Sequence, residues 1–166
     1  MKPTAEQEAL WQSVATMAVY GRDAVRTMRL IETDEVPKAD DRGRRRVEGY
    51  TIAWEGRVLE DWTNIVGTLH GAASAWIVDT CTSAAMVAIH TDTFWGPPMM
   101  AGMTLSMELQ YLHAAPLGTK LKIAVTILKC TETLAILRCE ITDLETGKLF
   151  VVGNHLKTWK PLKAKL

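Results

Sequence analysis

The chain has 166 residues, of which 48% are hydrophobic, so one domain with a sizeable core is expected. Its formal net charge is zero, which gives no indication of a nucleic acid or an acidic membrane surface as a partner. The longest apolar run, 84–89, is too short to cross a bilayer, and the N-terminal residues lack the apolar core of a signal peptide.

The N-terminal segment predicts an amphipathic helix. Thr4 and Gln7 fit a capping box, in which each side chain satisfies a free backbone N–H at the helix start. Apolar residues then recur at helical spacing as far as Gly21, which ends the pattern. A helix is therefore expected over about 4–20.

The next segments are less regular. A short strand is expected within 24–36. Residues 37–46 read as a charged, solvated loop, because Asp40 and Asp41 offset about half of its basic charge.

Beyond this loop the period of the pattern changes to two. Tyr50, Ile52 and Trp54 alternate with polar or small neighbours, which is typical of a strand. Glu55 and Gly56 then predict a turn, so a hairpin is expected that leads into the central segment.

The stretch Asn64–His90 is the feature around which the rest is organised. Its first part is rich in polar and glycine residues, whereas the part after Gly71 is small, apolar and rich in alanine, which predicts a helix buried on most faces. That helix carries one carboxylate, Asp79. Burying a carboxylate is costly unless it is paired or hydrated, so Asp79 is a functional candidate, with exposure on one edge as the alternative.

Four segments after a loop at 91–102 alternate with period two: 105–111, 120–127, 134–142 and 149–159. Short loops join them, so their pairing is antiparallel. The expected architecture is α+β: an antiparallel sheet of five to six strands around one long helix, with the first helix outside. One domain is expected over 1–166, divided into an N-terminal part (1–46), a core (47–160) and a tail (161–166).

The central stretch holds an ordered set of residues at fixed spacing: Asn64, Gly67, Thr68, Leu69, His70, Gly71, Ala72, Val78 and Asp79. Further positions continue the set: 111–118, 146–149, Gly153, His155 and Lys157. Over roughly 60–160 this set resembles the PaaI-type hotdog-fold thioesterases, most closely the acyl-CoA thioesterase thirteen branch. The resemblance implies a hotdog fold and hydrolysis of fatty-acyl or aryl-acyl coenzyme A without a metal or bound cofactor. Two departures are Ala72, where the family usually has a second glycine, and Thr104, where the closest branch has a serine.

The chemistry of these residues fits thioester hydrolysis. The N–H of Gly71 at the helix start and the amide of Asn64 would both donate to the thioester oxygen. Asp79 would activate a water as general base, or attack directly. Thr104 would hold that water or the carboxylate. His70 either fixes the loop by capping or takes a direct part, and the alternative for Asn64 is a plain turn residue.

The spacing of His70 and Asp79 adds an inference about assembly. On one helix, nine residues correspond to ~900° of rotation and ~13 Å of rise, so the two side chains point about 180° apart. Asp79 would therefore serve the helix start of a symmetry mate, which predicts a homodimer with shared sites. Exposed edge strands and six tryptophans fit further assembly into a homotetramer.

The resemblance also implies which residues contact the acyl-CoA: Tyr111, Leu112, His113, Ala114, Ala115, Pro116, Lys129, Cys130, Thr131, Thr133, Leu134 and Lys157. Lys129, Lys157 and Lys160 are candidates to meet phosphates, and ordinary surface lysines are the alternative. Two other functions remain open: a hotdog hydratase or dehydratase, which the pair Asn64 and Asp79 disfavours, and a non-catalytic acyl-CoA binder.

Two features concern the cellular compartment. The three cysteines are odd in number and lack metal-ligand spacing, so they are expected to be reduced core thiols of an intracellular protein. The last three residues, Ala164, Lys165 and Leu166, resemble a peroxisomal import signal. Peroxisomal localisation is expected if the source is eukaryotic, and cytoplasmic localisation otherwise.

Overall fold

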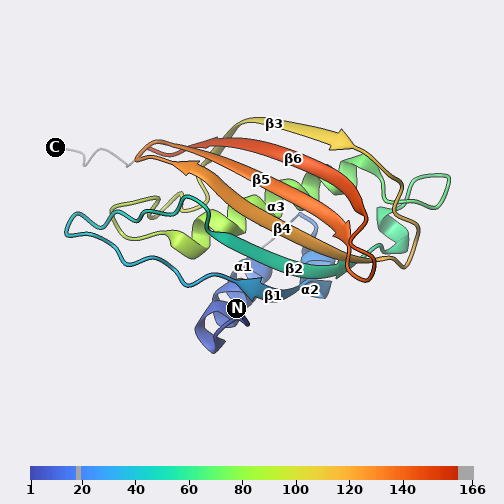
Figure 1. The fold of residues 1–166 in the computed structure, drawn as a ribbon, viewed down its shortest axis with the longest axis horizontal. Coiled ribbons are helices and arrows are strands. Elements are labelled where there is room, and N and C mark those ends of the chain that lie inside the picture. The colour runs from blue at the N-terminus through green and yellow to red at the C-terminus, as the bar shows by residue number, and fades with distance from the viewer. Residues whose placement is uncertain (18–19, 161–166) are drawn as a thin grey trace.

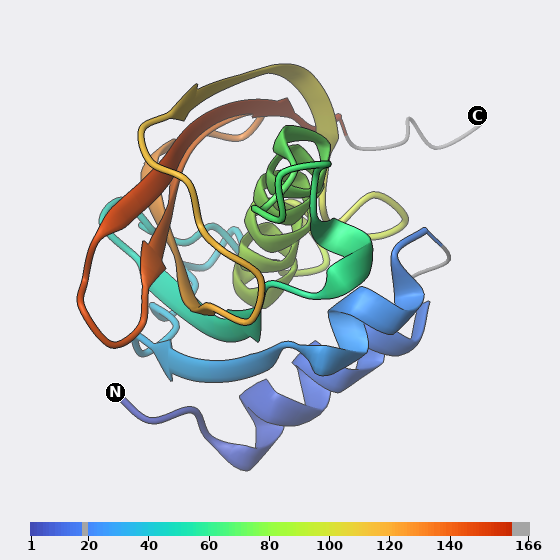
Figure 2. The same ribbon diagram turned by 90° about the vertical axis from the view of Figure 1, so that its right-hand side faces the viewer.

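A six-stranded antiparallel sheet curves around one long helix in the computed structural model, which describes residues 1–17 and 20–160 (Figure 1). The elements are α1 (Ala5–Met17), α2 (Arg22–Thr27), β1 (Arg29–Thr33), β2 (Thr51–Arg57), the 3₁₀ turn η1 (Glu60–Trp62), α3 (Gly71–Ile89), β3 (Met103–Tyr111), β4 (Lys120–Cys130), β5 (Leu134–Asp143) and β6 (Leu149–Thr158). The strand order is β1-β2-β4-β5-β6-β3, and α1 and α2 lie across the open side of the sheet (Figure 2). The expected α+β architecture is confirmed, and the C-terminal tripeptide lies outside the described residues.

Helix α3 fills the core because nearly all of its faces are apolar. Its side chains at Ile77, Val78, Cys81 and Ala85 have no exposed surface. The concave face of the sheet covers them with every second residue of β4, each with no exposed surface: Leu121, Ile123, Val125 and Ile127. Each such aliphatic side chain contributes roughly 1.5–3 kcal/mol by leaving water, so this contact is a large contribution to the stability of the fold.

By length and composition alone, α3 also meets the requirements for a helix that crosses a membrane. However, 56% of the corresponding window is buried inside the protein. Because the curved sheet covers the helix, we interpret α3 as the core helix and its apolar composition as a consequence of that position.

The N-terminal helix begins as expected. The backbone N–H of Thr4 donates to the Gln7 side chain at 2.9 Å, and the N–H of Gln7 donates to Thr4 Oγ1 at 3.3 Å. Helix α1 is described as far as Met17; residues 18–19, which precede the predicted end at about residue 20, lie outside the described part.

The segment after Gly21 contains an unexpected helix, α2, followed by β1. Helix α2 has only six residues, and only Val25 is buried, so no helical periodicity marks it in the sequence. The predicted short strand exists as β1, in the middle of 24–36.

The predicted hairpin at Glu55 and Gly56 is wrong. Strand β2 continues through both residues, with Glu55 paired to Lys122 and Gly56 paired to Leu121. A Cβ at Gly56 would make only ordinary contacts, so this glycine is not required by a turn. The sheet therefore overrides the local turn signal.

Strand β3 forms an edge of the sheet and is poorly covered within one chain. It pairs with β6 on one side only, and Leu105 is 55% exposed. The other exposed apolar side chains of β3 are Met103 and Tyr111. An edge strand with free backbone groups and apolar side chains is suited to pairing with a second chain.

The three cysteines are unpaired and buried, as expected. Burial raises the pKa of the Cys130 thiol to about 12 and also raises the pKa values of Cys81 and Cys139. These thiols are therefore neutral core groups rather than nucleophiles.

Candidate active site

The start of α3 leaves one backbone donor free. The side chain of His70 caps the helix by accepting the N–H of Ala72 at its Nδ1, 3.0 Å away, while its own backbone N–H donates to the carbonyl of Trp62. Among residues 1–17 and 20–160, no acceptor takes the N–H of Gly71. That N–H therefore faces outward at the positive end of the helix dipole, where it favours a negatively charged oxygen.

Asn64 lies in a tight loop just before this helix. Its Oδ1 accepts the backbone N–H groups of Val66 and Thr68, at 3.1 and 3.2 Å, which fixes the oxygen on the loop side. Its Nδ2 donates one hydrogen to Thr68 Oγ1 at 2.9 Å. Within the described part of the chain, nothing accepts the second amide hydrogen. The turn role and the donor role are thus compatible, since they use opposite sides of the amide.

A hollow of about 390 Å³ adjoins these two donors. Asn64 and Gly71 line it together with the segment 111–115. The hydroxyl of Tyr111 donates to the carbonyl of Gly71 at 3.1 Å, and Pro116 forms a β-bridge with Thr68. The structure therefore brings the predicted contacts Tyr111–Pro116 to the helix start.

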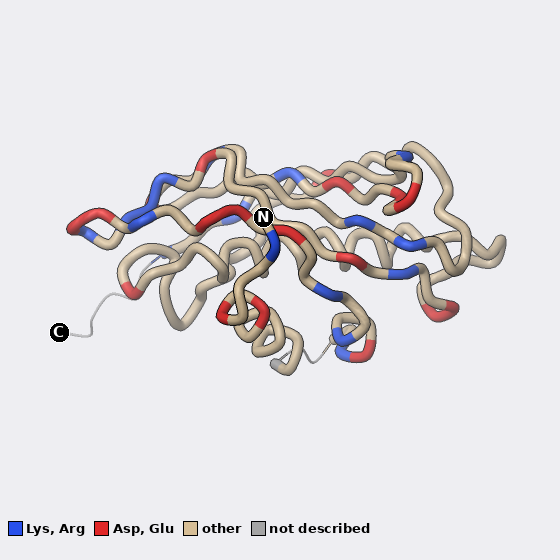
Figure 3. Tube along the Cα trace, turned by 60° about the horizontal axis from the view of Figure 1, so that its bottom comes forward, with Lys and Arg blue, Asp and Glu red and all other residues tan. Residues whose placement is uncertain are grey.

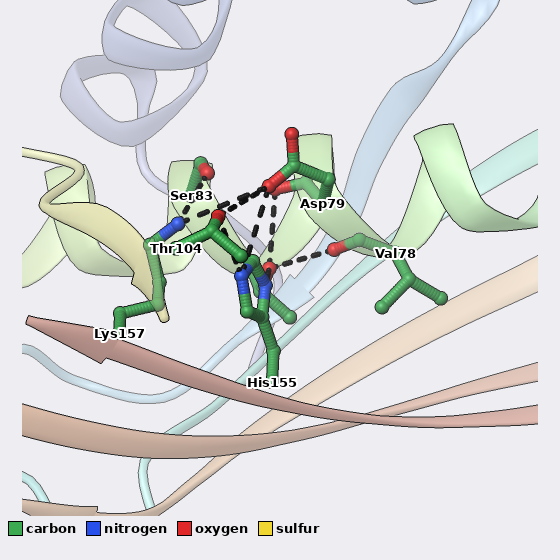
Figure 4. A network of polar contacts seen from close by, with 7 residues as sticks. Val78, Asp79, Ser83, Thr104, His155 and Lys157 are labelled. Carbon is green, nitrogen blue, oxygen red and sulfur yellow. Dashed lines mark hydrogen bonds and ion pairs between the residues drawn. The ribbon is translucent and has the colours of Figure 1, made fainter. Parts of the chain in front are cut away.

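Asp79 lies in a different place, against β3 and β6. Its Oδ1 is 3.4 Å from Thr104 Oγ1, 3.8 Å from His155 Nε2 and 3.9 Å from Lys157 Nζ (Figure 4). The Asp79 side chain is 50% exposed, so the carboxylate is both partnered and open to water. The predicted exposure on one edge is thus confirmed, and the functional role of Asp79 stays a prediction.

His155 is fully buried and connects two threonines. Its Nδ1 is 2.6 Å from Thr82 Oγ1, and its Nε2 is 2.9 Å from Thr104 Oγ1. The hydroxyl of Thr82 also lies 2.7 Å from the carbonyl of Val78 and must donate its hydrogen there, because two oxygens at that distance repel without one. Nδ1 of His155 therefore carries the imidazole hydrogen, and Nε2 accepts the hydroxyl of Thr104.

Nε2 accepts this hydrogen only while the imidazole is neutral. Burial, followed by the nearby charge of Lys157, lowers the pKa of His155 to about 4, against the smaller opposite effect of Asp79. Thr104 has one hydroxyl hydrogen, which goes to the nearer acceptor, His155 Nε2 at 2.9 Å, rather than to Asp79 Oδ1 at 3.4 Å. A water molecule that contacts both oxygens can therefore donate one hydrogen to each.

Lys157 lies inside the protein beside Asp79. It is 1% exposed, and its Nζ donates to Ser83 Oγ at 3.0 Å. Burial lowers the pKa of Lys157, and Asp79 partly opposes that shift. Lys157 therefore borders the candidate base, whereas Lys129 is exposed and pairs with Glu48 at 3.3 Å.

The predicted contacts at the β4–β5 turn lie elsewhere. Cys130, Thr131 and Thr133 line a hollow of about 780 Å³ near the C-terminal end of α3. Leu134 begins β5 and is 43% exposed. The predicted site residues thus form three separate groups in one chain: the helix start, the Asp79 cluster and this turn.

The sequence interpretation gave no role to His155, Thr82 or Ser83. A signal was available for the first, because Gly153, His155 and Lys157 occupy alternate positions of β6 and share its buried face. No sequence signal marks the two helix hydroxyls, since serine and threonine on a small-residue helix are common packing residues.

The amino-acid sequence of this chain is similar to those of known proteins. The model of the thioesterase superfamily matches residues 66–150. Human acyl-coenzyme A thioesterase 13 is 36% identical over 106 residues, which cover 64% of this chain and 71% of the human protein.

Solved structures agree on the fold. The crystal structure of thioesterase superfamily member 2 from Mus musculus has 27% identity and a TM-score of 0.68, with 94% of this chain and 98% of the mouse chain covered. The PaaI protein from the phenylacetic acid degradation operon of E. coli has 12% identity and a TM-score of 0.66, with 95% and 94% covered. These similarities confirm the hotdog fold.

Proposed function

The chain belongs to the thioesterase superfamily and is a thioester hydrolase, and we propose that it hydrolyses acyl-coenzyme A thioesters at sites shared between two copies of the chain. The name of the human relative supports coenzyme A as the thiol part of the substrate. The observation that carries the proposal is that Gly71 and Asn64, each with a donor that no described residue uses, both line the hollow beside the helix start.

The helix start polarises the carbonyl. The Gly71 N–H and the second amide hydrogen of Asn64 donate to the thioester oxygen, whose negative charge grows as the carbonyl carbon becomes tetrahedral. His70 contributes indirectly, because its side chain occupies the neighbouring N–H of Ala72 and holds the first turn. The loop bonds of Asn64 hold its amide in place before the substrate binds, so little reorganisation accompanies the reaction.

Asp79 and Thr104 orient the water molecule that attacks the thioester. A water that donates one hydrogen to each lies with its lone pair free for attack on the carbonyl carbon. His155 keeps the hydroxyl of Thr104 turned toward itself, which leaves the oxygen of Thr104 as an acceptor on the water side.

Asp79 acts twice in the reaction, first as a general base and then as a general acid. The water oxygen bonds to the carbonyl carbon while Asp79 takes one of its hydrogens, which gives a tetrahedral oxyanion. The carbon–sulfur bond then breaks, the thiolate of coenzyme A receives the proton from Asp79, and the carboxylic acid product ionises in water.

The two halves of the site come from different subunits in this proposal. Gly71 and Asp79 are eight residues apart on one helix, a rise of about 12 Å, so both cannot reach one carbonyl within the same chain. Pairing of β3 with β3 of a second chain about a two-fold axis sets the helix start of one subunit beside Asp79 of the other. The exposed apolar side chains of β3 support this contact.

The substitution Asp79→Asn tests the proposal. It keeps the shape of a half-exposed side chain, so folding and assembly should be unchanged, while turnover should fall by at least ~100-fold, the range for a lost general base. Release of free thiol from a series of acyl-CoAs measures turnover, and thermal melting checks the fold.

A matched control is Asp92→Asn, which removes an exposed carboxylate outside the site and should leave turnover unchanged. Near-normal thiol release by the Asp79→Asn variant would contradict the assignment of Asp79 as the base.

A further inference from the structure

Lys157 is a buried cation to which the proposed reaction gives no role. It lies on β6, where it pairs with Thr104 of β3 on one side and with Ala135 of β5 on the other, and it is 1% exposed. A buried ammonium group is costly unless a hydrogen bond or an opposite charge compensates it. An apolar side chain would fill the same space at a lower cost, so packing alone does not account for the charge.

The opposite charge beside Lys157 is the candidate base. Among residues 1–17 and 20–160, Asp79 is the only carboxylate that forms an ion pair with Lys157. Nζ of Lys157 donates to Ser83 Oγ at 3.0 Å and lies 3.9 Å from Asp79 Oδ1 (Figure 4). The second distance is too long for a direct hydrogen bond, so this contact is an attraction between charges. Because Lys157 is buried, water screens the attraction less than it would at the surface.

Two other groups lie within 4 Å of the same carboxylate oxygen, but neither attracts it. The one hydroxyl hydrogen of Thr104 goes to Nε2 of His155. That nitrogen of the neutral imidazole carries no hydrogen, so it faces Asp79 Oδ1 at 3.8 Å as one acceptor faces another. Lys157 is therefore the one described group that draws the carboxylate toward β6.

The other oxygen of the carboxylate is open. Within the part of the chain that the structure describes, no group donates to Asp79 Oδ2, and the side chain is 50% exposed. A half-exposed aspartate on a helix can rotate to another rotamer that faces water unless a contact opposes the rotation. The attraction on Oδ1 opposes it and keeps the carboxylate beside Thr104.

No wider excess of positive charge supplies this attraction. The chain has 19 basic and 19 acidic residues, and Figure 3 shows the lysines and arginines spread over several strands and loops. In the described residues, the other lysines that form ion pairs are Lys120, Lys122 and Lys129, and each pairs with a glutamate. Their side chains are all at least 32% exposed, so the buried position distinguishes Lys157 from them.

We propose that Lys157 is a positioning residue, whose ammonium group holds the Asp79 carboxylate in the orientation that accepts a hydrogen from the attacking water; this rests on the acyl-CoA thioesterase function proposed above. Lys157 keeps its own hydrogens throughout, so the transfer of the proton from water to Asp79 and on to the thiolate is unchanged. Because Lys157 acts through Asp79, its loss should lower kcat rather than raise KM.

The variant Lys157→Met tests this role, because methionine is similar in length, packs well and carries no charge. The kcat for an acyl-CoA should fall by about 10–100-fold, the range for a misplaced catalytic group, while KM changes little. The thermal midpoint should stay the same or rise, since an apolar side chain costs less to bury than an ammonium group. The matched control is Lys122→Met, which removes an ion-paired lysine from β4 and should leave kcat unchanged.

The dependence of kcat on pH separates positioning from packing. Burial lowers the pKa of Lys157, and Asp79 partly opposes that shift. Lys157 is charged below this pKa and neutral above it. The ratio of kcat in the unaltered protein to kcat in Lys157→Met should therefore be large near neutral pH and fall toward one at a lower pH than the titration of an ordinary lysine. A ratio that stays constant with pH, or an unchanged kcat in the variant, would overturn the proposal.

A titration without substrate tests the ion pair itself. The NMR signal of Lys157 Cε follows the protonation of the amine. The substitution Asp79→Asn removes the charge that opposes the lowering of the Lys157 pKa, so the midpoint should move down by roughly one pH unit. An unchanged midpoint would overturn the proposal, also in the case that Lys157→Met does not fold. Absence of turnover by the unaltered protein would contradict the proposed function instead, and the titration would still decide whether Lys157 acts on Asp79.

Discussion

The surroundings of Asp79 depend on the protonation state of one residue, His155. A neutral imidazole with its hydrogen on Nδ1 donates to Thr82 and accepts from Thr104. Protonation would place a cation beside the buried ammonium of Lys157, with little water to screen the two charges. The hydrogen bonds of His155 and its lowered pKa are therefore both consistent with a neutral imidazole.

This constraint predicts how stability varies with pH. The pKa of His155 is about 4 in the folded chain and about 6.5 when unfolded, so the unfolded state binds more protons between these values. The His155 contribution should be complete above pH 6.5 and should fall by at most about 3 kcal/mol as the pH drops toward 4. Urea unfolding at a series of pH values measures the free energy of unfolding, which should change less with pH for His155→Gln than for the unaltered chain. An equal dependence of the unfolding free energy on pH in the two proteins would show that protonation of His155 does not destabilise the fold.

At the scale of elements, α3 and β6 approach each other closely at Gly153. A Cβ at Gly153 would lie 2.7 Å from Val78 Cγ1, so only glycine lets the helix approach the sheet this closely. This approach sets the position of α3 against β6, and with it the distances from Asp79 to His155 and Lys157.

The substitution Gly153→Ala should therefore destabilise the fold by about 1–3 kcal/mol through overpacking. Adding Val78→Ala makes room for the new methyl group, so the double variant should be more stable than the sum of the single effects implies, by about 1 kcal/mol. Chemical denaturation of the four proteins measures this coupling. Gly56→Ala is the matched control, since its Cβ would lie at an ordinary 3.5 Å from Ile123 and should cost little. Strict additivity would contradict the close-packing argument.

At the scale of the whole molecule, the separation of Asp79 from the helix start is the decisive feature. If the two halves of a site come from different subunits, a hybrid dimer of two inactive chains contains one complete site. Mixing Asp79→Asn chains with Asn64→Ala chains should therefore restore part of the thiol release that each variant lacks. Size-exclusion chromatography with differently tagged chains confirms that subunits exchange. Verified hybrids without recovered activity would place both halves of the site in one chain.

Sequence reasoning predicted the elements whose signals are local. The capping box at Thr4, the start of α3 at Gly71 and the four period-two strands all depend on residues that are close in the chain, and the structure confirms them. The errors also have local causes. Helix α2 is too short to show a period, and the Glu55–Gly56 turn signal is weaker than the pairing of β2 with its neighbours on both sides.

The tertiary structure alone decided which groups surround Asp79 and which do not. His155 and Lys157 are more than seventy residues away in sequence, and only the packing of β6 against α3 brings them within 4 Å of the carboxylate. The same packing buries Lys157, which from sequence alone was a candidate for a surface phosphate contact. The hollow of about 780 Å³ has a similar origin, because the loop 37–46 and the β4–β5 turn that line it meet only in the folded chain. Residue types and local spacing thus determined the candidate chemistry, whereas the partners of each charge depended on long-range packing that no local pattern encodes.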